Sequence, residues 1–230
     1  MNVQGFQKLT LLDFPGLAAC TVFCGGCNLR CPFCHNASLV TSPKENPNEE
    51  TALFSYLEKR IGLLDGVCVT GGEPLLQADL IPALQRFRSM GFAVKLDTNG
   101  ALPDRLAKVL EAGVLDYVAM DVKSSPQGYD RATGTDLGFL PFAESMRRIR
   151  ESGVRYEFRT TLVKGIHTEE DVRSLSELFL SEENIFLQGF RDSGNLLGSG
   201  VSAFSQQEML RFLSIVKERV PAATLRGGES

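Results

Sequence analysis

The chain has 230 residues, of which 43% are hydrophobic, so it is long enough to bury one core of ordinary size. The net charge is −4 and Lys and Arg are scattered, which argues against a nucleic-acid partner and against electrostatic binding to a membrane. The first residues do not resemble a signal peptide, and no apolar stretch reaches the roughly 18 residues that span a bilayer. We therefore expect a cytoplasmic protein, in which thiols stay reduced and six cysteines indicate metal binding or catalysis.

Strand-like and helix-like segments alternate along the chain. Short apolar runs predict strands, in chain order, at residues 18–23, 66–72, 92–96, 117–120, 155–163 and 184–187, with a short last strand at 222–225. Helical spacing of apolar residues predicts helices at residues 49–61, 78–90, 102–112, 141–151, 168–179 and 205–216. Six βα units in series predict an α/β fold with parallel strands, in one domain over residues 1–230.

Two architectures are compatible with such a series, a doubly wound sheet and a barrel. Residue types that can do chemistry follow four different strands: first the cysteines, then GGEP, DTNG and DVK. In parallel barrels the active site is built from the carboxyl ends of many strands. This distribution favours an open, partial (β/α)6 TIM-like barrel, although periodicity alone does not separate the two architectures.

The segment CGGCNLRCPFCHN holds four of the six cysteines. A zinc site of four thiolates is disfavoured, because too few residues separate the two C-x2-C pairs for the chain to return to the metal. A ferredoxin-like run also fails, because Thr21 stands where its first cysteine is required. A third interpretation is a cubane cluster on Cys27, Cys31 and Cys34, with one iron left open to a substrate.

The C-x3-C-x2-C spacing, directly after the first predicted strand, resembles the signature of the radical S-adenosylmethionine (SAM) superfamily. Phe33 fills the aromatic position before the last cysteine of that signature. The resemblance implies a [4Fe–4S] cluster on Cys27, Cys31 and Cys34, with SAM as the second cofactor. Cys24 departs from the family pattern, and its role stays open at the level of the sequence.

The resemblance also implies which residues hold SAM. In the superfamily a GGE motif at this place binds the methionine amino group, which assigns that role to Gly71, Gly72 and Glu73. A tight turn would explain the glycines but not the acid. The family counterpart of DTNG lies near the ribose and the amino-acid end of the ligand, which indicates Asp97 and Asn99, with an Asx-type turn as the alternative.

Alternation places Asp121 and Lys123 on one side of the fourth strand, as in the D-x-K motif of activating enzymes. A surface ion pair of little energetic value is the alternative. Arg159 is flanked by apolar residues and needs an anionic partner, which the SAM carboxylate, Asp121 or Glu73 could supply.

Two further residues, Phe33 and His35, lie beside the last cysteine. The CHN triplet that contains His35 is shared with the activating-enzyme branch. In that branch the residues around this cysteine lie against the adenine of SAM, and the resemblance implies the same position here.

Several motifs extend the resemblance over most of the chain. GFQKLTLLDFPG, CNLRCPFCHN, TGGEP, DTNG, MDVK and RTTLVKG look like the anaerobic ribonucleoside-triphosphate reductase activating proteins and, more widely, the pyruvate formate-lyase activating enzymes. The resemblance implies that one electron from the cluster cleaves SAM to methionine and a 5′-deoxyadenosyl radical. That radical would take hydrogen from a glycine of a partner glycyl-radical enzyme, with anaerobic ribonucleotide reductase as the expected partner.

The same resemblance implies flavodoxin or ferredoxin as the electron donor. Two alternatives stay open. One is a radical enzyme that acts on a small molecule, such as a deazapurine synthase, and the other is a non-enzymatic zinc protein.

Overall fold

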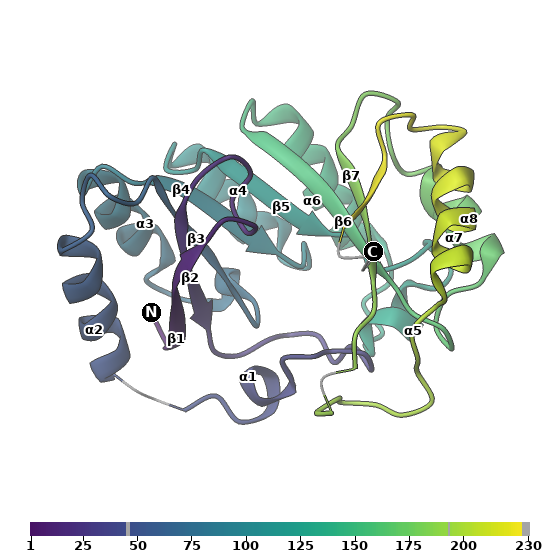
Figure 1. Ribbon diagram of the computed structural model, residues 1–230, viewed down its shortest axis with the longest axis horizontal. Coiled ribbons are helices and arrows are strands. Elements are labelled where there is room, and N and C mark those ends of the chain that lie inside the picture. The colour runs from purple at the N-terminus through teal and green to yellow at the C-terminus, as the bar shows by residue number, and fades with distance from the viewer. Residues whose placement is uncertain (45–46, 193, 227–230) are drawn as a thin grey trace.

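The computed structural model describes residues 1–44, 47–192 and 194–226 of the chain (Figure 1). Within these ranges the strands form one eight-stranded sheet. The strands are β1 (Val3–Thr10), β2 (Ala19–Cys24), β3 (Gly66–Gly71), β4 (Ala93–Thr98), β5 (Tyr117–Asp121), β6 (Arg155–Leu162), β7 (Ile185–Gly189) and β8 (Thr224–Arg226).

The order of the strands in the sheet is their order in the chain. All neighbouring pairs from β2 to β8 are parallel, whereas β1 runs antiparallel to β2. The outer strands β1 and β8 are not neighbours, so the sheet remains open. The α/β class and the open, partial barrel that the sequence predicts are therefore confirmed. Because the strands from β2 onward are parallel, their carboxyl ends meet at one rim of the sheet.

Strand β1 is absent from the strands that the sequence predicts. Its burial does not alternate regularly, because only its first and last residues, Val3 and Thr10, are fully buried. The apolar period of two that identifies a half-buried strand is therefore missing. Pairing with β2 holds it in the sheet, in a register interrupted by two irregularities.

The helices connect successive parallel strands and lie along the sheet. They are α1 (Ala37–Thr41), α2 (Pro47–Glu58), α3 (Leu80–Ser89), α4 (Pro103–Glu111), α5 (Tyr129–Thr133), α6 (Leu140–Glu151), α7 (Glu169–Ser176) and α8 (Gln206–Lys217), with the 3-10 turn η1 (Pro74–Leu76). In Figure 1, α2 and α3 lie toward one end of the sheet, and α7 and α8 lie toward the other. No helix in the described ranges is long and apolar enough to cross a membrane.

Aromatic and branched side chains fill the core between the sheet and the helices. Phe158 on β6 is fully buried, and its ring lies 5.9 Å from that of Phe179 and 5.3 Å from that of Tyr156. Burial of this apolar area stabilises the strand that carries Arg159. The core therefore holds a site residue in place from the opposite face of the same strand.

The first prediction concerns this packing. We expect Phe158→Ala to lower the free energy of unfolding by about 3–5 kcal/mol, because it removes a buried ring and leaves a cavity. Leu140→Ala is the control, since Leu140 is 83% exposed and its loss should change stability by less than about 0.5 kcal/mol. Urea unfolding measures both values, and equal stability of the two variants would contradict the described packing.

Candidate active site

A cavity of about 600 Å³ opens at the carboxyl ends of the parallel strands. Of the thirteen site residues that the sequence predicts, Glu73 is the one that does not line this cavity. The predicted residues that do line it are Cys27, Cys31, Phe33, Cys34, His35, Gly71, Gly72, Asp97, Asn99, Asp121, Lys123 and Arg159. Segments that are far apart in the sequence thus meet at one place.

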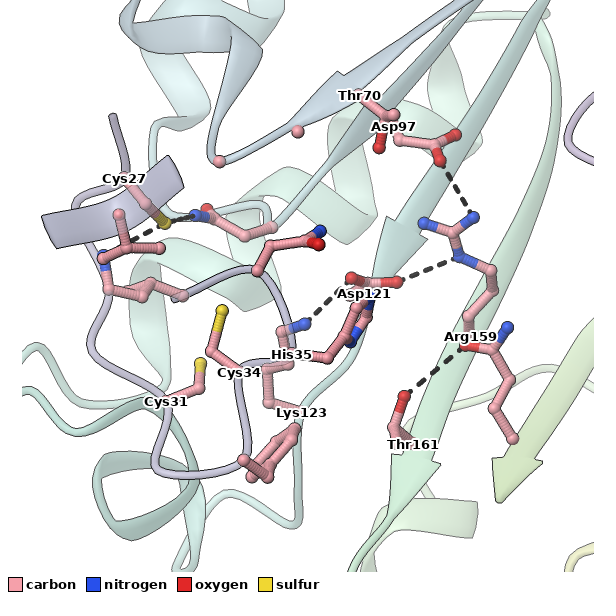
Figure 2. Close-up of a pocket in the computed structure, with 18 of the residues that line it drawn as sticks. Cys27, Cys31, Cys34, His35, Thr70, Asp97, Asp121, Lys123, Arg159 and Thr161 are labelled. Atoms are coloured by element: carbon pink, nitrogen blue, oxygen red, sulfur yellow. Dashed lines mark hydrogen bonds and ion pairs between the residues drawn. The ribbon is translucent and has the colours of Figure 1, made fainter. Parts of the chain in front are cut away.

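Three of the four clustered cysteines face this cavity. Figure 2 shows the sulfur atoms of Cys27, Cys31 and Cys34 on the loop that follows β2. Cys24 ends β2, is fully buried and does not line the cavity. Burial raises the pKa of the Cys24 thiol to about 12. Cys24 is therefore a core thiol, which answers the question that the sequence leaves open.

The three cavity cysteines are free thiols, without a disulfide among them. Burial raises the pKa of Cys27 and raises that of Cys31 to about 11, while the nearby Lys123 charge acts in the opposite direction on both. A raised pKa favours the protonated form of Cys27 and Cys31 at neutral pH, and binding a metal as thiolate requires the loss of that proton. The Leu29 amide donates a hydrogen bond to Cys27 Sγ at 3.4 Å, which favours the thiolate.

The cavity thiols can be compared with the ligand sets that metals require. In the described part of the chain, no three His, Cys, Asp or Glu side chains are grouped closely enough to hold one metal ion. Thiolates hold an iron–sulfur cluster by its corners, which are more widely spaced than the ligands of one ion. Three thiols around one cavity fit a cluster with three protein ligands.

The loop between β2 and α1, residues 25–36, carries Cys27, Cys31 and Cys34 and is here called the cysteine loop. The turn formed by Gly71 and Gly72 at the end of β3, here called the glycine turn, lies against it. The Gly72 amide donates to the Cys24 carbonyl at 2.9 Å, and the Glu73 amide donates to the Gly26 carbonyl at 2.8 Å. A Cβ atom at Gly72 would overlap the Gly26 carbonyl, and Gly71 has a left-handed φ of +121°. Both glycines are therefore required by this close approach of two backbones.

The Glu73 carboxylate does not line the cavity, and its contact with SAM stays a prediction. It accepts hydrogen bonds from the Leu75 amide at 3.0 Å, the Thr98 hydroxyl at 2.8 Å and the Asn99 amide at 2.7 Å. Burial raises the pKa of Glu73 to about 7, although these hydrogen bonds favour the charged form. Glu73 thus joins the turn after β3 to the turn after β4.

Five charged side chains form a continuous series of ion pairs along the strand ends. Lys95 pairs with Asp97, and Arg159 bridges Asp97 and Asp121 at 3.0 and 2.9 Å. Lys123 completes the series with a 2.8 Å contact to Asp121. Figure 2 shows Arg159 between the two carboxylates. Asp97 and Asp121, rather than Glu73, are therefore the partners that the buried arginine requires.

The series has three positive charges and two negative charges. Burial alone would raise the pKa of Asp121, but the charges of Arg159 and Lys123 and their hydrogen bonds hold it well below its ordinary value. The pKa of Asp97 is also lowered, because Arg159 and Lys95 outweigh its burial. Both carboxylates are therefore ionised at neutral pH, and the series keeps one positive charge in excess.

The remaining predicted residues surround the cysteines. Asn99 Nδ2 lies 3.6 Å from Cys27 Sγ and donates to Asn28 Oδ1 at 3.0 Å. Asn99 Oδ1 accepts from the Ala101 amide, so the predicted Asx-type turn and the position in the cavity occur together. His35 also faces the cavity, and burial followed by the Lys123 charge lowers its pKa.

Several residues that line the cavity were not predicted from the sequence. Thr161 lies two residues after Arg159 on β6, so strand alternation could have identified it. Gln7 on β1 and Gln188 on β7 carry no such signal, because uncharged polar residues on strands usually face solvent. They extend the cavity from the cysteines toward the two edges of the sheet.

Comparison with known proteins decides the family. Residues 21–179 match the model of the Radical SAM superfamily. The chain belongs to this superfamily. It is therefore an enzyme whose cofactors are a [4Fe–4S] cluster and SAM.

Two relatives indicate the branch of the superfamily. The chain is 30% identical to a protein of Methanocaldococcus jannaschii named as a glycyl-radical enzyme activating enzyme, over 76% of this chain and 74% of the relative. It is 28% identical to the pyruvate formate-lyase-activating enzyme of Clostridium pasteurianum, over 80% of this chain and 78% of that enzyme. These matches support the glycyl-radical activating branch of the radical SAM superfamily.

A solved structure supports the same fold. Streptococcus suis SuiB bound to S-adenosylmethionine superposes with a TM-score of 0.65 at 15% sequence identity. The match covers 88% of this chain and 48% of SuiB, so this chain spans about half the length of that protein. The open, partial barrel is therefore the radical SAM fold.

A second prediction follows from the ion-pair series. We expect Asp121→Asn to lower the free energy of unfolding at pH 7 by about 1–2 kcal/mol, a value reduced by the partial exposure of the pair. A carboxyl group whose pKa is lowered by folding stabilises the protein above its unfolded pKa and loses this effect as it is protonated. The difference from wild type should therefore shrink as the pH falls below about 4.

Urea unfolding at pH 7, 5 and 3.5 measures this dependence. Asp104→Asn is the control, because Asp104 is 88% exposed and its charge is screened by solvent. A destabilisation by Asp121→Asn that is the same at all three pH values would contradict the assigned ion pairs.

Proposed function

We propose that this radical SAM enzyme activates a glycyl-radical enzyme, with anaerobic ribonucleotide reductase as its protein substrate. The observation that carries the proposal is the placement of three thiols, and not the fourth, around a cavity with a series of ion pairs. The names of the two relatives support a glycyl-radical enzyme as the class of partner. The choice of ribonucleotide reductase rests on the sequence motifs described above.

In this proposal Cys27, Cys31 and Cys34 are the protein ligands of the cluster, as the three cavity thiols. When bound, the reduced cluster and SAM supply methionine and a 5′-deoxyadenosyl radical, which becomes 5′-deoxyadenosine by taking one hydrogen atom from the glycine Cα of the partner. The residues of this chain bind and orient the reactants and keep water away from the radical. Residues 1–230 act as one domain in this scheme.

The ion pairs suit the amino-acid end of SAM. Asp121 offers a carboxylate to an ammonium group, while Arg159 and Lys123 offer cations to a carboxylate. Phe33 and His35 line the cavity on either side of Cys34, and they are the proposed contacts of the adenine.

Gly71, Gly72, Asp97 and Asn99 complete the proposed binding surface. Gly71 and Gly72 expose their backbone to the cavity without side chains. Asp97 is held between Lys95 and Arg159, so its carboxylate is fixed in orientation before a ligand arrives. Asn99 also lines the cavity, with its side-chain nitrogen 3.6 Å from Cys27 Sγ.

The open sheet supports a protein rather than a small molecule as the substrate. The cavity lining extends from the cysteines to Gln7 on β1 and to Arg226 on β8. These are the two edge strands of the open sheet. A segment of a partner protein can therefore reach the cavity between these edges. Flavodoxin or ferredoxin is the proposed electron donor, and the cytoplasm is the proposed location.

The direct test uses the electron paramagnetic resonance signal of a glycyl radical. The chain is reconstituted anaerobically with iron and sulfide and mixed with SAM, dithionite and anaerobic ribonucleotide reductase. We expect a glycyl-radical doublet on the reductase, together with 5′-deoxyadenosine. Cys31→Ala should lose iron, nucleoside and radical, whereas Cys24→Ala, the matched control, should retain all three.

The outcomes of this test separate the competing functions. Nucleoside release without a radical on the reductase would contradict the proposed partner and favour a small-molecule substrate. Zinc in place of iron, or equal iron loss in Cys24→Ala and Cys31→Ala, would contradict the cluster assignment.

A further prediction concerns SAM binding. We expect Arg159→Met to weaken the binding of SAM to the reconstituted enzyme by about 10- to 100-fold, because a charge-assisted contact is lost. Asp97 and Asp121 each keep a lysine partner in this variant, so the variant should fold. Arg155→Met on the same strand is the control, since Arg155 is exposed and outside the cavity. Equilibrium dialysis measures the dissociation constants, and unchanged binding in Arg159→Met would refute the assigned contact.

A further inference from the structure

The cysteine loop is held from outside at positions on both sides of Cys31. The Arg30 amide donates to the Thr133 carbonyl at 2.8 Å, at the end of α5. The Gly198 amide donates to the Pro32 carbonyl at 2.9 Å, from the connection between β7 and α8. Two backbone hydrogen bonds from distant segments therefore fix the residues that directly flank one of the three cavity thiols.

A glycine without room for a side chain makes one of these contacts, Gly198, and another directly follows the residue that makes the other, Gly134 after Thr133. A Cβ atom at Gly198 would lie 2.6 Å from the Cβ atom and 2.9 Å from the Cα atom of Pro32. A Cβ atom at Gly134 would overlap the Arg30 carbonyl oxygen, and Gly134 has a left-handed φ of +65°. The backbones approach too closely for any other residue to be accommodated without a shift.

The segment of residues 194–204, here called the strap, is also fixed at a second point. Ser202 exchanges two backbone hydrogen bonds with Lys164, at 2.9 and 3.1 Å, directly after β6. Figure 1 shows the connection from β7 to α8 passing beside the loop that follows β2. The strap therefore joins the rim near Arg159 to the middle of the cysteine loop.

We propose that Gly198 is a positioning residue of the cluster site, which holds the loop between Cys31 and Cys34 through Pro32. This inference rests on the proposed cluster ligands. The strap contributes no ligand of its own, since its contact is made by a backbone amide. Its effect is to limit the movement of two thiols relative to the third. Partners outside the ligand set commonly tune the affinity of a metal site in this way.

Loss of the Gly198 contact should affect the cluster site and not the stability of the fold. Gly198 is half-buried in a surface connection, and its lost hydrogen bond could be replaced by water. A displaced strap should therefore leave the fold intact. The three thiols, however, need a defined spacing to hold a cubane by three corners. A shift at Pro32 should therefore change the rate of iron release and the spectrum of the cluster.

The test compares Gly198→Ala with Gly5→Ala. Gly5 lies on β1 with no atom within 4 Å of its added Cβ, and neither glycine has a left-handed φ. The proteins are reconstituted, and the release of iron to a chelator is followed without SAM or partner. We expect release about tenfold faster than wild type in Gly198→Ala and unchanged in Gly5→Ala. The resonance spectrum of the reduced cluster should change only in Gly198→Ala.

Thermal unfolding of the iron-free variants checks that each one is folded. Ser202→Pro provides a second route, because it removes the Ser202 amide that donates to Lys164 and adds no group beside Pro32. Ser202→Pro should also accelerate iron release. If Gly198→Ala does not fold, the release rate of Ser202→Pro tests the role of the strap. Wild-type release rates and spectra in these variants would overturn the role of the strap. A wild type that holds no cluster would instead refute the proposed function.

Discussion

The close backbone contact between the cysteine loop and the glycine turn after β3 holds the cysteines against the rim of the sheet. Gly72 leaves no space between its own backbone and that of Gly26, and the amide of Glu73 joins the same carbonyl. The buried Glu73 carboxylate then connects this turn to Thr98 and Asn99 at the end of β4. Asn99 in turn contacts Cys27. The cysteine loop and the ends of β3 and β4 therefore form one connected unit.

Charge pairing extends this unit across the open sheet. Asp97, Asp121 and Arg159 come from β4, β5 and β6, and each of them would be costly to bury alone. Pairing keeps the carboxylates ionised and fixes their orientation, so a zwitterionic ligand meets groups that are already in place. The same strands are anchored on their other face by core side chains such as Phe158. Packing and electrostatics therefore act on the same three strands.

The sequence predicted the fold class and most of the site, because both depend on local order along the chain. Parallel strands bring the residues that follow them to one rim, so the pattern of strands and polar residues was enough to place Asp97, Asp121 and the cysteines together. The sequence did not indicate β1, whose burial is irregular, nor the three hydrogen bonds that the Glu73 carboxylate accepts. Tertiary contacts decide both cases, and the same is true of the buried position of Cys24.

Mössbauer spectroscopy of the ⁵⁷Fe-reconstituted enzyme, with and without SAM, tests the central claim most directly. A cluster held by three cysteines has one iron without a protein ligand, so one of its four iron sites should change its isomer shift when SAM binds. The other three sites should remain as they were. Four equivalent irons that do not respond to SAM would show a fourth protein ligand and would contradict the account.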